Sequence, residues 1–281
     1  MSTDNLDPET VEAFGEEWTA FDQSALSAAE LQRQFDAYFA IFPWAALADD
    51  AHGFDLGCGS GRWARLVAPR VGYLHCIDAS AAAIEVARGN LADQPNCEFH
   101  AASVDAMCLA DGSMDFGYSL GVLHHVPDTL AGIKACTAKL KPGAPFLIYL
   151  YYALDQRPAW FKAIFRVADA LRLVVSRLSH RQKVVVSTVI ASLVYYPFSR
   201  FALLVERTGG EVDGLPLSTY RDRSFYSMRT DALDRFGTRL EQRFTREQVV
   251  AMLEQAGCEN VVVSTRVPYW CAVGYRRDDS L

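Results

Sequence analysis

A short apolar strand, a glycine-rich turn and the start of a helix follow one another at residues 53–63, and this run restricts the possible folds most. The turn reads Gly-Cys-Gly-Ser-Gly at positions 57–61. Glycines let the backbone turn tightly and let a ligand approach without a Cβ in the way. The helix that follows offers free N–H groups and the positive end of its dipole. The run therefore predicts a ligand site at a strand-to-helix turn.

The spacing of the glycines discriminates between ligands. A dinucleotide site has the pattern G-x-G-x-x-G, whereas Arg62 occupies the third position after Gly59 here. The P-loop pattern also fails, because no Gly-Lys-Ser/Thr follows. Asp55 lies two residues before the first glycine, and an acid there suits a cationic ligand group. Asp78 ends the next expected strand, where a carboxylate can accept hydrogen bonds from two ribose hydroxyls.

Strand and helix patterns alternate around this turn, which predicts parallel strands joined by crossover helices. The last two expected strands are too close together for a crossover helix, so we expect them to pair antiparallel. The predicted fold class is α/β, a doubly wound, mostly parallel, Rossmann-like sheet of seven strands with an antiparallel last strand and a large helical insertion. The expected strands are 53–56, 73–77, 97–101, 114–119, 145–151, 260–265 and 269–275.

The alternation stops near residue 152 and resumes with a helix at 245–256, which Thr245 and Gln248 cap. The predicted organisation is therefore an N-terminal helical cap at 1–50, a core made of 51–152 and 244–281, and a helical lid or insertion at 153–243.

At this point the chain resembles the class I S-adenosylmethionine-dependent methyltransferases, of the type that act on small molecules. The matching features are the D-x-G-x-G-x-G run at 55–61, the acid Asp78, the segment 118–128 with its His-His pair, and the Lys-Leu-Lys-Pro-Gly-Ala turn at 139–144. The resemblance covers roughly 51–152 and 244–281. It implies a methyltransferase with S-adenosyl-L-methionine as its cofactor.

The resemblance also implies which residues bind the cofactor. The glycine turn takes its methionine part, Asp78 takes the ribose, and residues after the third strand hold the adenine. The family often has an Asp preceded by Gly after that strand, whereas this chain has Ala102-Ser103, with Asp105 two residues further on. We therefore assign the adenine to Ser103 and the backbone around Val104. The expected cofactor-binding residues are Asp55, Gly57, Cys58, Gly59, Gly61, Asp78, Ala79, Ser103, Val104 and Leu120.

His124 and His125 follow the fourth strand, on the edge where such sheets bind ligands. A histidine near the reacting methyl group can accept a proton from a substrate hydroxyl, so we treat both as candidate catalytic residues. The alternative is a histidine that only shapes the loop. We expect no metal site, because adjacent histidines lack the i, i+4 spacing of a helical ligand pair and no Cys or carboxylate cluster adjoins them.

The insertion is basic and apolar. Residues 157–182 predict an amphipathic helix with Trp160, Ile164, Val167 and Leu171 on one face. Between 151 and 208 there are nine Lys/Arg and three Asp/Glu, a net charge of +6, while the whole chain carries −7 and the remainder −13. Such a helix can lie on an anionic membrane surface or gather a phosphorylated substrate, or it can be a solvated lid.

A second apolar stretch, 184–198 and 201–205, contains Pro197 and Arg200, so we expect no membrane span. A buried helix, a dimer face and a wall for a lipid-like substrate all fit it, and we expect burial. The expected substrate-binding residues are Tyr152, Phe225, Tyr226 and Arg229.

The favoured function is O-methylation of a small-molecule acceptor, a sugar or natural product. The alternatives are a membrane-surface methyltransferase of a quinone or polyprenyl lipid, and a non-catalytic binding module that kept the fold. The acidic net charge excludes the whole molecule as a general nucleic-acid binder. Seven cysteines without a C-x-x-C pair and an acidic N-terminus without an apolar signal segment predict a reducing, cytoplasmic location. A homodimer and peripheral membrane contact are possible partnerships.

Overall fold

The computed structural model describes residues 5–154, 158–212 and 214–278. The chain divides into two compact units. The core unit comprises the described residues of 1–22, 32–156 and 240–281, and the insertion unit those of 23–31 and 157–239. Residues 1–4 of the predicted cap, the start of the predicted helix at residue 157, and residues 279–281 lie outside the described part.

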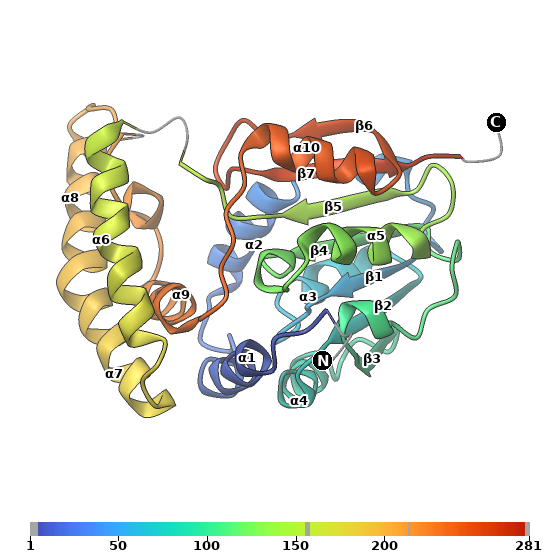
Figure 1. The fold of residues 1–281 in the computed structure, drawn as a ribbon, viewed down its shortest axis with the longest axis horizontal. Helices are drawn as coiled ribbons and strands as arrows, with labels where there is room; N and C mark the ends of the chain where they lie inside the picture. Colours follow the sequence, from blue (N-terminus) through green and yellow to red (C-terminus); the bar gives the residue numbers. More distant parts are fainter. Residues whose placement is uncertain (1–4, 155–157, 213, 279–281) are drawn as a thin grey trace. The chain divides into compact units, whose positions relative to one another are not determined.

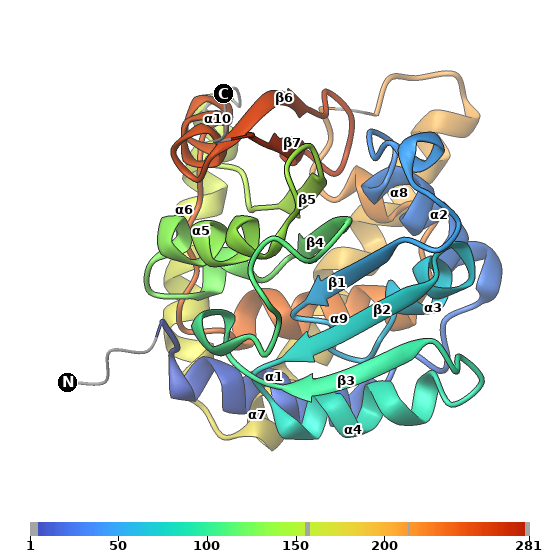
Figure 2. The same cartoon turned by 90° about the vertical axis from the view of Figure 1, so that its right-hand side faces the viewer.

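The core unit is built on one seven-stranded sheet with the order β3-β2-β1-β4-β5-β7-β6 (Figures 1 and 2). The pairs from β3 to β5 are parallel, whereas β7 is antiparallel to both β5 and β6. This confirms the predicted doubly wound sheet with an antiparallel last strand. The strands are β1 His52–Leu56, β2 Tyr73–Asp78, β3 Cys97–Ala101, β4 Phe116–Leu120, β5 Pro145–Tyr149, β6 Cys258–Val263 and β7 Cys271–Arg276.

Most strands begin or end within a few residues of the prediction. The fourth strand starts at Phe116 rather than 114, because Met114 makes only an isolated bridge to Leu140. The penultimate strand starts at Cys258, directly after Gly257 with its φ of +83°. Gly257 thus ends the preceding helix, as the sequence predicts.

Helices cover both faces of the sheet. The buried side chains of α5 and α10 join the core around β1, β4 and β5, while α3 and α4 contact β2 (Figure 1). The largest fully buried side chains include Phe54, Phe116 and Phe146, one on each central strand. Burial of such rings is the main stabilising contribution to the core. The helices of this unit are α1 Pro8–Ala20, α3 Ala64–Val67, α4 Ala81–Asn90, α5 Thr129–Lys139 and α10 Arg246–Gln255, and α2 Ala28–Tyr38 crosses into it from the insertion unit.

Side-chain caps fix where these helices begin. Ser80 accepts a hydrogen bond from the Ala83 N–H at the start of α4. Thr245 and Gln248 form the predicted capping box of α10, in which each side chain accepts from the other residue's backbone N–H. Capping satisfies N–H groups that have no partner inside the helix and contributes roughly 1 kcal/mol each.

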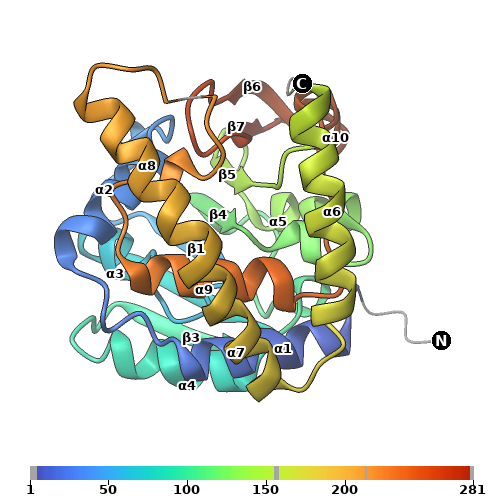
Figure 3. The ribbon, with the colours of Figure 1, turned by 90° about the vertical axis from the view of Figure 1, so that its left-hand side faces the viewer.

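The described residues of the insertion unit contain helices, turns and loops but no strand, as the absence of a strand pattern predicts. Its helices are α6 Ala159–Val175, α7 His180–Ile190, α8 Tyr196–Arg207 and α9 Phe225–Gly237. The predicted single helix at 157–182 is wrong at its C-terminal end, because Ser179 caps a new helix with Gln182. Both α6 and α7 contact α9, and Val175, Tyr195, Met228 and Phe236 contribute to a small core (Figure 3).

The predicted burial of the second apolar stretch is wrong. The helices α7 and α8 form one helical run, His180–Arg207, joined by a π-helical turn at Ala191–Tyr195. Only 22% of the most apolar 18-residue stretch of this run is buried. Pro197 lacks an N–H and cannot make the usual hydrogen bond to the preceding turn. The π-helical turn lies directly before it and α8 begins at Tyr196, so the helix continues past the proline. By length and composition alone this run could cross a membrane, and a single helix of this kind is weak evidence for a span.

Candidate cofactor and methyl-transfer site

The glycine turn has a backbone that only glycine adopts easily. Gly57, Gly59 and Gly61 have φ angles of +74°, +54° and +76°. A Cβ at Gly57 would lie 2.2 Å from Cγ2 of Val122, and a Cβ at Gly59 would lie 2.8 Å from the ring of Trp18 in α1. Side chains are therefore excluded at these positions by both conformation and space, because Val122 and Trp18 pack against the turn.

Asp78 ties this turn to the end of β2. Its Oδ2 accepts a hydrogen bond from the Gly59 N–H at 2.9 Å, and its Oδ1 accepts one from the Ser80 N–H at 2.8 Å. Burial raises the pKa of Asp78, and the two N–H donors oppose that rise. An ionised carboxylate has about four lone-pair sites, so acceptor capacity remains for two ribose hydroxyls.

Asp55 is a buried acid directly beneath the turn. Its residue is 1% exposed, and its Oδ2 has no hydrogen-bond partner among the described residues. Burial raises the pKa of Asp55 to about 8, the Tyr118 hydroxyl lowers it, and the nearby Asp78 raises it further. A buried carboxyl group with an unsatisfied oxygen costs free energy unless a donor or cation reaches it. The site thus offers a place for a positively charged ligand group.

The remaining predicted cofactor residues lie at the same edge of the sheet. Cys58, Ala79 and Leu120 lie at or just beyond the carboxyl ends of β1, β2 and β4, the edge where open α/β sheets bind ligands. After β3, the Ser103 hydroxyl donates to Asp105 Oδ1 at 2.8 Å.

Val104 begins a short 3-10 helix, Val104–Ala106, and is buried. Its backbone lies next to Ser103 at this edge. The assignment of the adenine to these positions stays a prediction.

The two histidines have different environments. His124 is fully buried, and neither ring nitrogen has a hydrogen-bond partner among the residues described. Burial lowers the pKa of His124 well below its ordinary value, and His125 and Arg243 lower it further, so the ring is neutral at pH 7. Its ring centroid lies 3.9 Å from that of Tyr151. A neutral imidazole without a partner is able to accept a proton.

His125 is anchored instead. Its Nδ1 lies 2.6 Å from the carbonyl oxygen of Leu240, so this nitrogen carries the proton and donates it. The Gln242 N–H donates to the carbonyl of His124 at 3.0 Å, and the Gln242 side chain donates to the carbonyl of Val126. Segment 240–244 therefore holds the loop that carries the histidine pair. The catalytic role of His124 and His125 stays a prediction.

Aromatic rings that the sequence analysis missed surround this place in the core unit. Tyr38 of α2 lies 4.8 Å from Trp63 and 5.0 Å from Tyr149, measured between ring centroids. Phe14 of α1 lies 5.0 Å from His125. Only the pairing of α1 and α2 with the sheet brings these rings together, and their helical spacing in the sequence gives no signal of it.

The predicted substrate residues do not gather in the core unit. Tyr152 packs beside Tyr269 and Trp270, with ring centroids 5.4 and 6.3 Å away, and thus contributes to the core. Phe225, Tyr226 and Arg229 belong to α9 in the insertion unit. The Tyr226 hydroxyl accepts a hydrogen bond from the Gln23 N–H at 3.0 Å within that unit. Their role with a substrate stays a prediction.

Comparison with known proteins fits this geometry. A family model described as a methyltransferase domain matches residues 54–143, which contain the glycine turn, Asp78 and both histidines. Over these residues the chain is similar to the methyltransferase domain family. The glycine turn, the paired N–H donors on Asp78 and the unsatisfied oxygen of Asp55 fit a sulfonium nucleoside such as S-adenosylmethionine.

The chain is similar to ubiquinone biosynthesis O-methyltransferases of Xanthomonas. It is 29% identical over 135 residues to that of Xanthomonas campestris pv. campestris (strain B100), an alignment that covers 47% of this chain and 55% of the relative. It is 27% identical over 183 residues to that of Xanthomonas axonopodis pv. citri (strain 306), which covers 64% of this chain and 72% of the relative. The chain thus spans about half the length of the first of these relatives.

Among solved structures, a protein of Bacillus halodurans C-125 proposed to be a methyltransferase aligns with a TM-score of 0.50 and 15% identity. The alignment covers 84% of this chain and 73% of that one. At 15% identity, this similarity shows a shared fold alone.

Asp78→Asn should weaken S-adenosylmethionine binding about 10- to 100-fold, because a charge-assisted acceptor is replaced by a group that presents an amide N–H. Isothermal titration calorimetry measures the loss. Asp111→Asn, an exposed acid paired with Lys139, is the matched control and should bind the cofactor as the parent does. An unchanged affinity in Asp78→Asn would contradict the role of this carboxylate.

Asp55→Asn should stabilise the cofactor-free protein increasingly as pH rises. The native pKa of about 8 lies above the unfolded value of 3.8, so the native state binds more protons and loses stability as pH rises between these values. From pH 5 to pH 7 the advantage of Asp55→Asn should grow by about 2 to 3 kcal/mol, at about 1.4 kcal/mol per pH unit. Urea unfolding at both pH values measures it, and a constant difference would contradict the raised pKa.

Proposed function

We propose that this chain transfers the methyl group of S-adenosylmethionine to a hydroxyl oxygen of an apolar, lipid-like acceptor, such as a quinol or a polyprenyl phenol, at a membrane surface. The observation that supports it best is an exposed apolar surface on the insertion unit. The likeness to ubiquinone biosynthesis O-methyltransferases also favours an apolar aromatic acceptor.

The exposed apolar surface consists of outward-facing side chains on two helices. Along α6 they recur every three or four residues, and along α7 and α8 they extend from Val185 to Leu204. Figure 3 shows the course of these helices. Val167 and Leu193 are the most exposed, at 73% and 71%. The surface comprises Trp160, Ile164, Val167, Leu171 and Val174 of α6 and Val185, Val189, Leu193, Tyr196, Phe198, Phe201 and Leu204 of the α7–α8 run. Exposed large apolar side chains in this number favour an interaction site.

Charge complementarity selects a membrane as the occupant of this surface. The same segment, 151–208, carries a net charge of +6 in a chain of −7. Among its basic residues Arg166, Arg177 and Arg181 are exposed. Amphipathic helices with Lys and Arg beside an apolar face bind anionic lipid surfaces, where acyl chains take the apolar face and headgroups pair with the cations.

The chemistry at the core unit suits a hydroxyl acceptor. When bound, the cofactor supplies a methyl group on a positively charged sulfur, which is already a good leaving group. The hydroxyl must lose its proton as the oxygen attacks, and neutral His124 has one unprotonated ring nitrogen that is able to accept it. The rest of the catalysis is alignment of the reacting atoms, which positioning alone can accelerate strongly.

A sugar acceptor is the competing substrate, and it needs no membrane. Incubation of the enzyme with methyl-labelled cofactor and either a lipid extract or a water-soluble metabolite extract distinguishes the two. Label in the lipid extract alone supports the proposal. Label in the soluble extract alone favours the sugar or natural product, and the absence of cofactor binding by calorimetry favours a non-catalytic module.

The double substitution Val167→Glu/Leu193→Glu should abolish flotation with phosphatidylglycerol vesicles, because two carboxylates enter an apolar surface that faces anionic lipid. Both positions are more than 70% exposed, so the fold should tolerate the change. The matched control is Val262→Glu, since Val262 is a half-exposed apolar residue of β6 in the core unit. If the parent protein does not float with the vesicles and stays at the bottom of the density gradient, the membrane proposal is wrong.

His124→Gln should lower kcat by about 100-fold with a phenolic acceptor at pH 7, since general base catalysis typically contributes at least that factor. The loss should shrink toward pH 10, where a phenol ionises without help. A purely structural role would give the same loss at every pH. His52→Gln is the control, because His52 is the first residue of β1, at the end opposite the glycine turn; this variant should keep the activity of the parent.

A further inference from the structure

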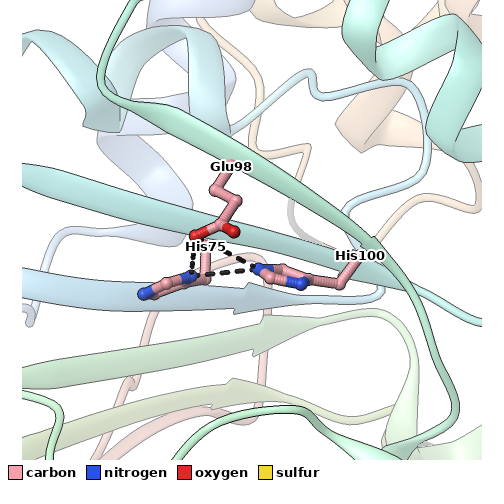
Figure 4. Close-up of side chains that lie close together, drawn as sticks. All are labelled: His75, Glu98 and His100. Atoms are coloured by element: carbon pink, nitrogen blue, oxygen red, sulfur yellow. Dashed lines mark hydrogen bonds and ion pairs between the residues drawn. The ribbon is translucent and has the colours of Figure 1, made fainter.

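Three histidines, half of the six in the chain, lie on β1, β2 and β3, at positions that are not among the expected cofactor residues. The parallel register places Glu98 of β3 opposite His75 of β2, and His100 opposite Ile77. Since side chains alternate in a strand, Glu98 and His100 share a face, and His75 faces the same side. Figure 4 shows the three side chains converging.

The three ligand-type atoms form a nearly equilateral triangle. His75 Nδ1 lies 3.0 Å from His100 Nε2 and 3.3 Å from Glu98 Oε2, and His100 Nε2 lies 3.7 Å from the same oxygen. In a tetrahedral zinc site with bonds of 2.0–2.2 Å, neighbouring ligand atoms are about 3.4 Å apart. A single N–H···N hydrogen bond between the rings explains one edge of this triangle but not the other two.

The surroundings also suit a metal ion. The side chains of His75 and His100 are 13% and 17% exposed, whereas Glu98 is 48% exposed and leaves a path from solvent. The Tyr73 hydroxyl donates to Glu98 Oε2 at 3.2 Å, which orients the carboxylate as outer-shell partners of metal ligands do.

We propose that His75, Glu98 and His100 form a divalent transition-metal site, zinc being the best fit, that joins β2 to the edge strand β3. Two imidazoles and one carboxylate are a ligand set typical of zinc, and water completes the fourth position. The site is separate from the cofactor residues and does not depend on the proposed acceptor. Its role is to stabilise the pairing of β2 with β3, close to the carboxyl end of β2 that presents Asp78. It departs from the expectation of no metal, which considered only His124 and His125.

The test is titration of the tag-free, chelator-treated protein with zinc chloride, followed by calorimetry and by thermal unfolding. A Cys108→Ser background removes the one exposed thiol among the described cysteines, which could bind zinc by itself. We expect one equivalent of zinc bound and a rise in Tm on binding. Cobalt chloride should give the visible absorption of a four-coordinate site.

Glu98→Gln and His100→Gln should each weaken zinc binding at least 100-fold, and Tyr73→Phe about 10-fold. Glu98→Gln keeps the shape of an exposed side chain, so it should fold even if His100→Gln does not. His52→Gln, whose ring packs on Tyr73 but lies outside the triangle, is the matched control and should bind zinc normally. S-adenosylmethionine affinity should be unchanged in all of them.

Binding of less than about 0.2 equivalents by the parent protein at micromolar zinc would overturn the site. Equal affinity in the parent and in Glu98→Gln would overturn it as well. In both cases the three residues would form a hydrogen-bonded cluster only.

Discussion

The contact between Asp78 and two backbone N–H groups holds the cofactor site together. Gly59 lies in the turn after β1 and Ser80 caps the helix after β2, so one carboxylate joins two crossover connections. The contact is made with Gly59 in the left-handed conformation, which glycine adopts easily. The geometry of the turn, the position of α4 and the place for a ribose therefore depend on each other.

The sheet and the cofactor residues could be predicted because their signals are local. Glycines at 57, 59 and 61, an acid at the end of β2 and a capping box at Thr245 each act within a few residues of themselves. The strand order follows from general rules for crossover connections. Because these signals are local, the errors in the predicted sheet are shifts of one or two residues at strand ends, such as the start of β4 at Phe116 instead of 114.

The features that the sequence could not reveal depend on distant pairing. The rings around the histidine pair come from α1, α2 and β5, and the anchor of His125 is a carbonyl 115 residues away. Similarly, Glu98 and His100 follow the period of a strand, but His75 joins them only through the register of β2 with β3. For the insertion, hydrophobic periodicity identified an apolar face correctly yet could not tell whether protein or another medium covers it.

The π-helical turn between α7 and α8 affects the shape of the surface that the insertion offers. Up to that turn the outward side chains follow one another four residues apart, at Val185, Val189 and Leu193. An additional residue in one turn rotates everything beyond it about the helix axis, so α8 continues the row at a different angle, with Phe198, Phe201 and Leu204. A straight narrow row would match the seam of a two-helix coiled coil. Exposed side chains that point in different directions before and after the turn instead suit a broad, flat partner surface.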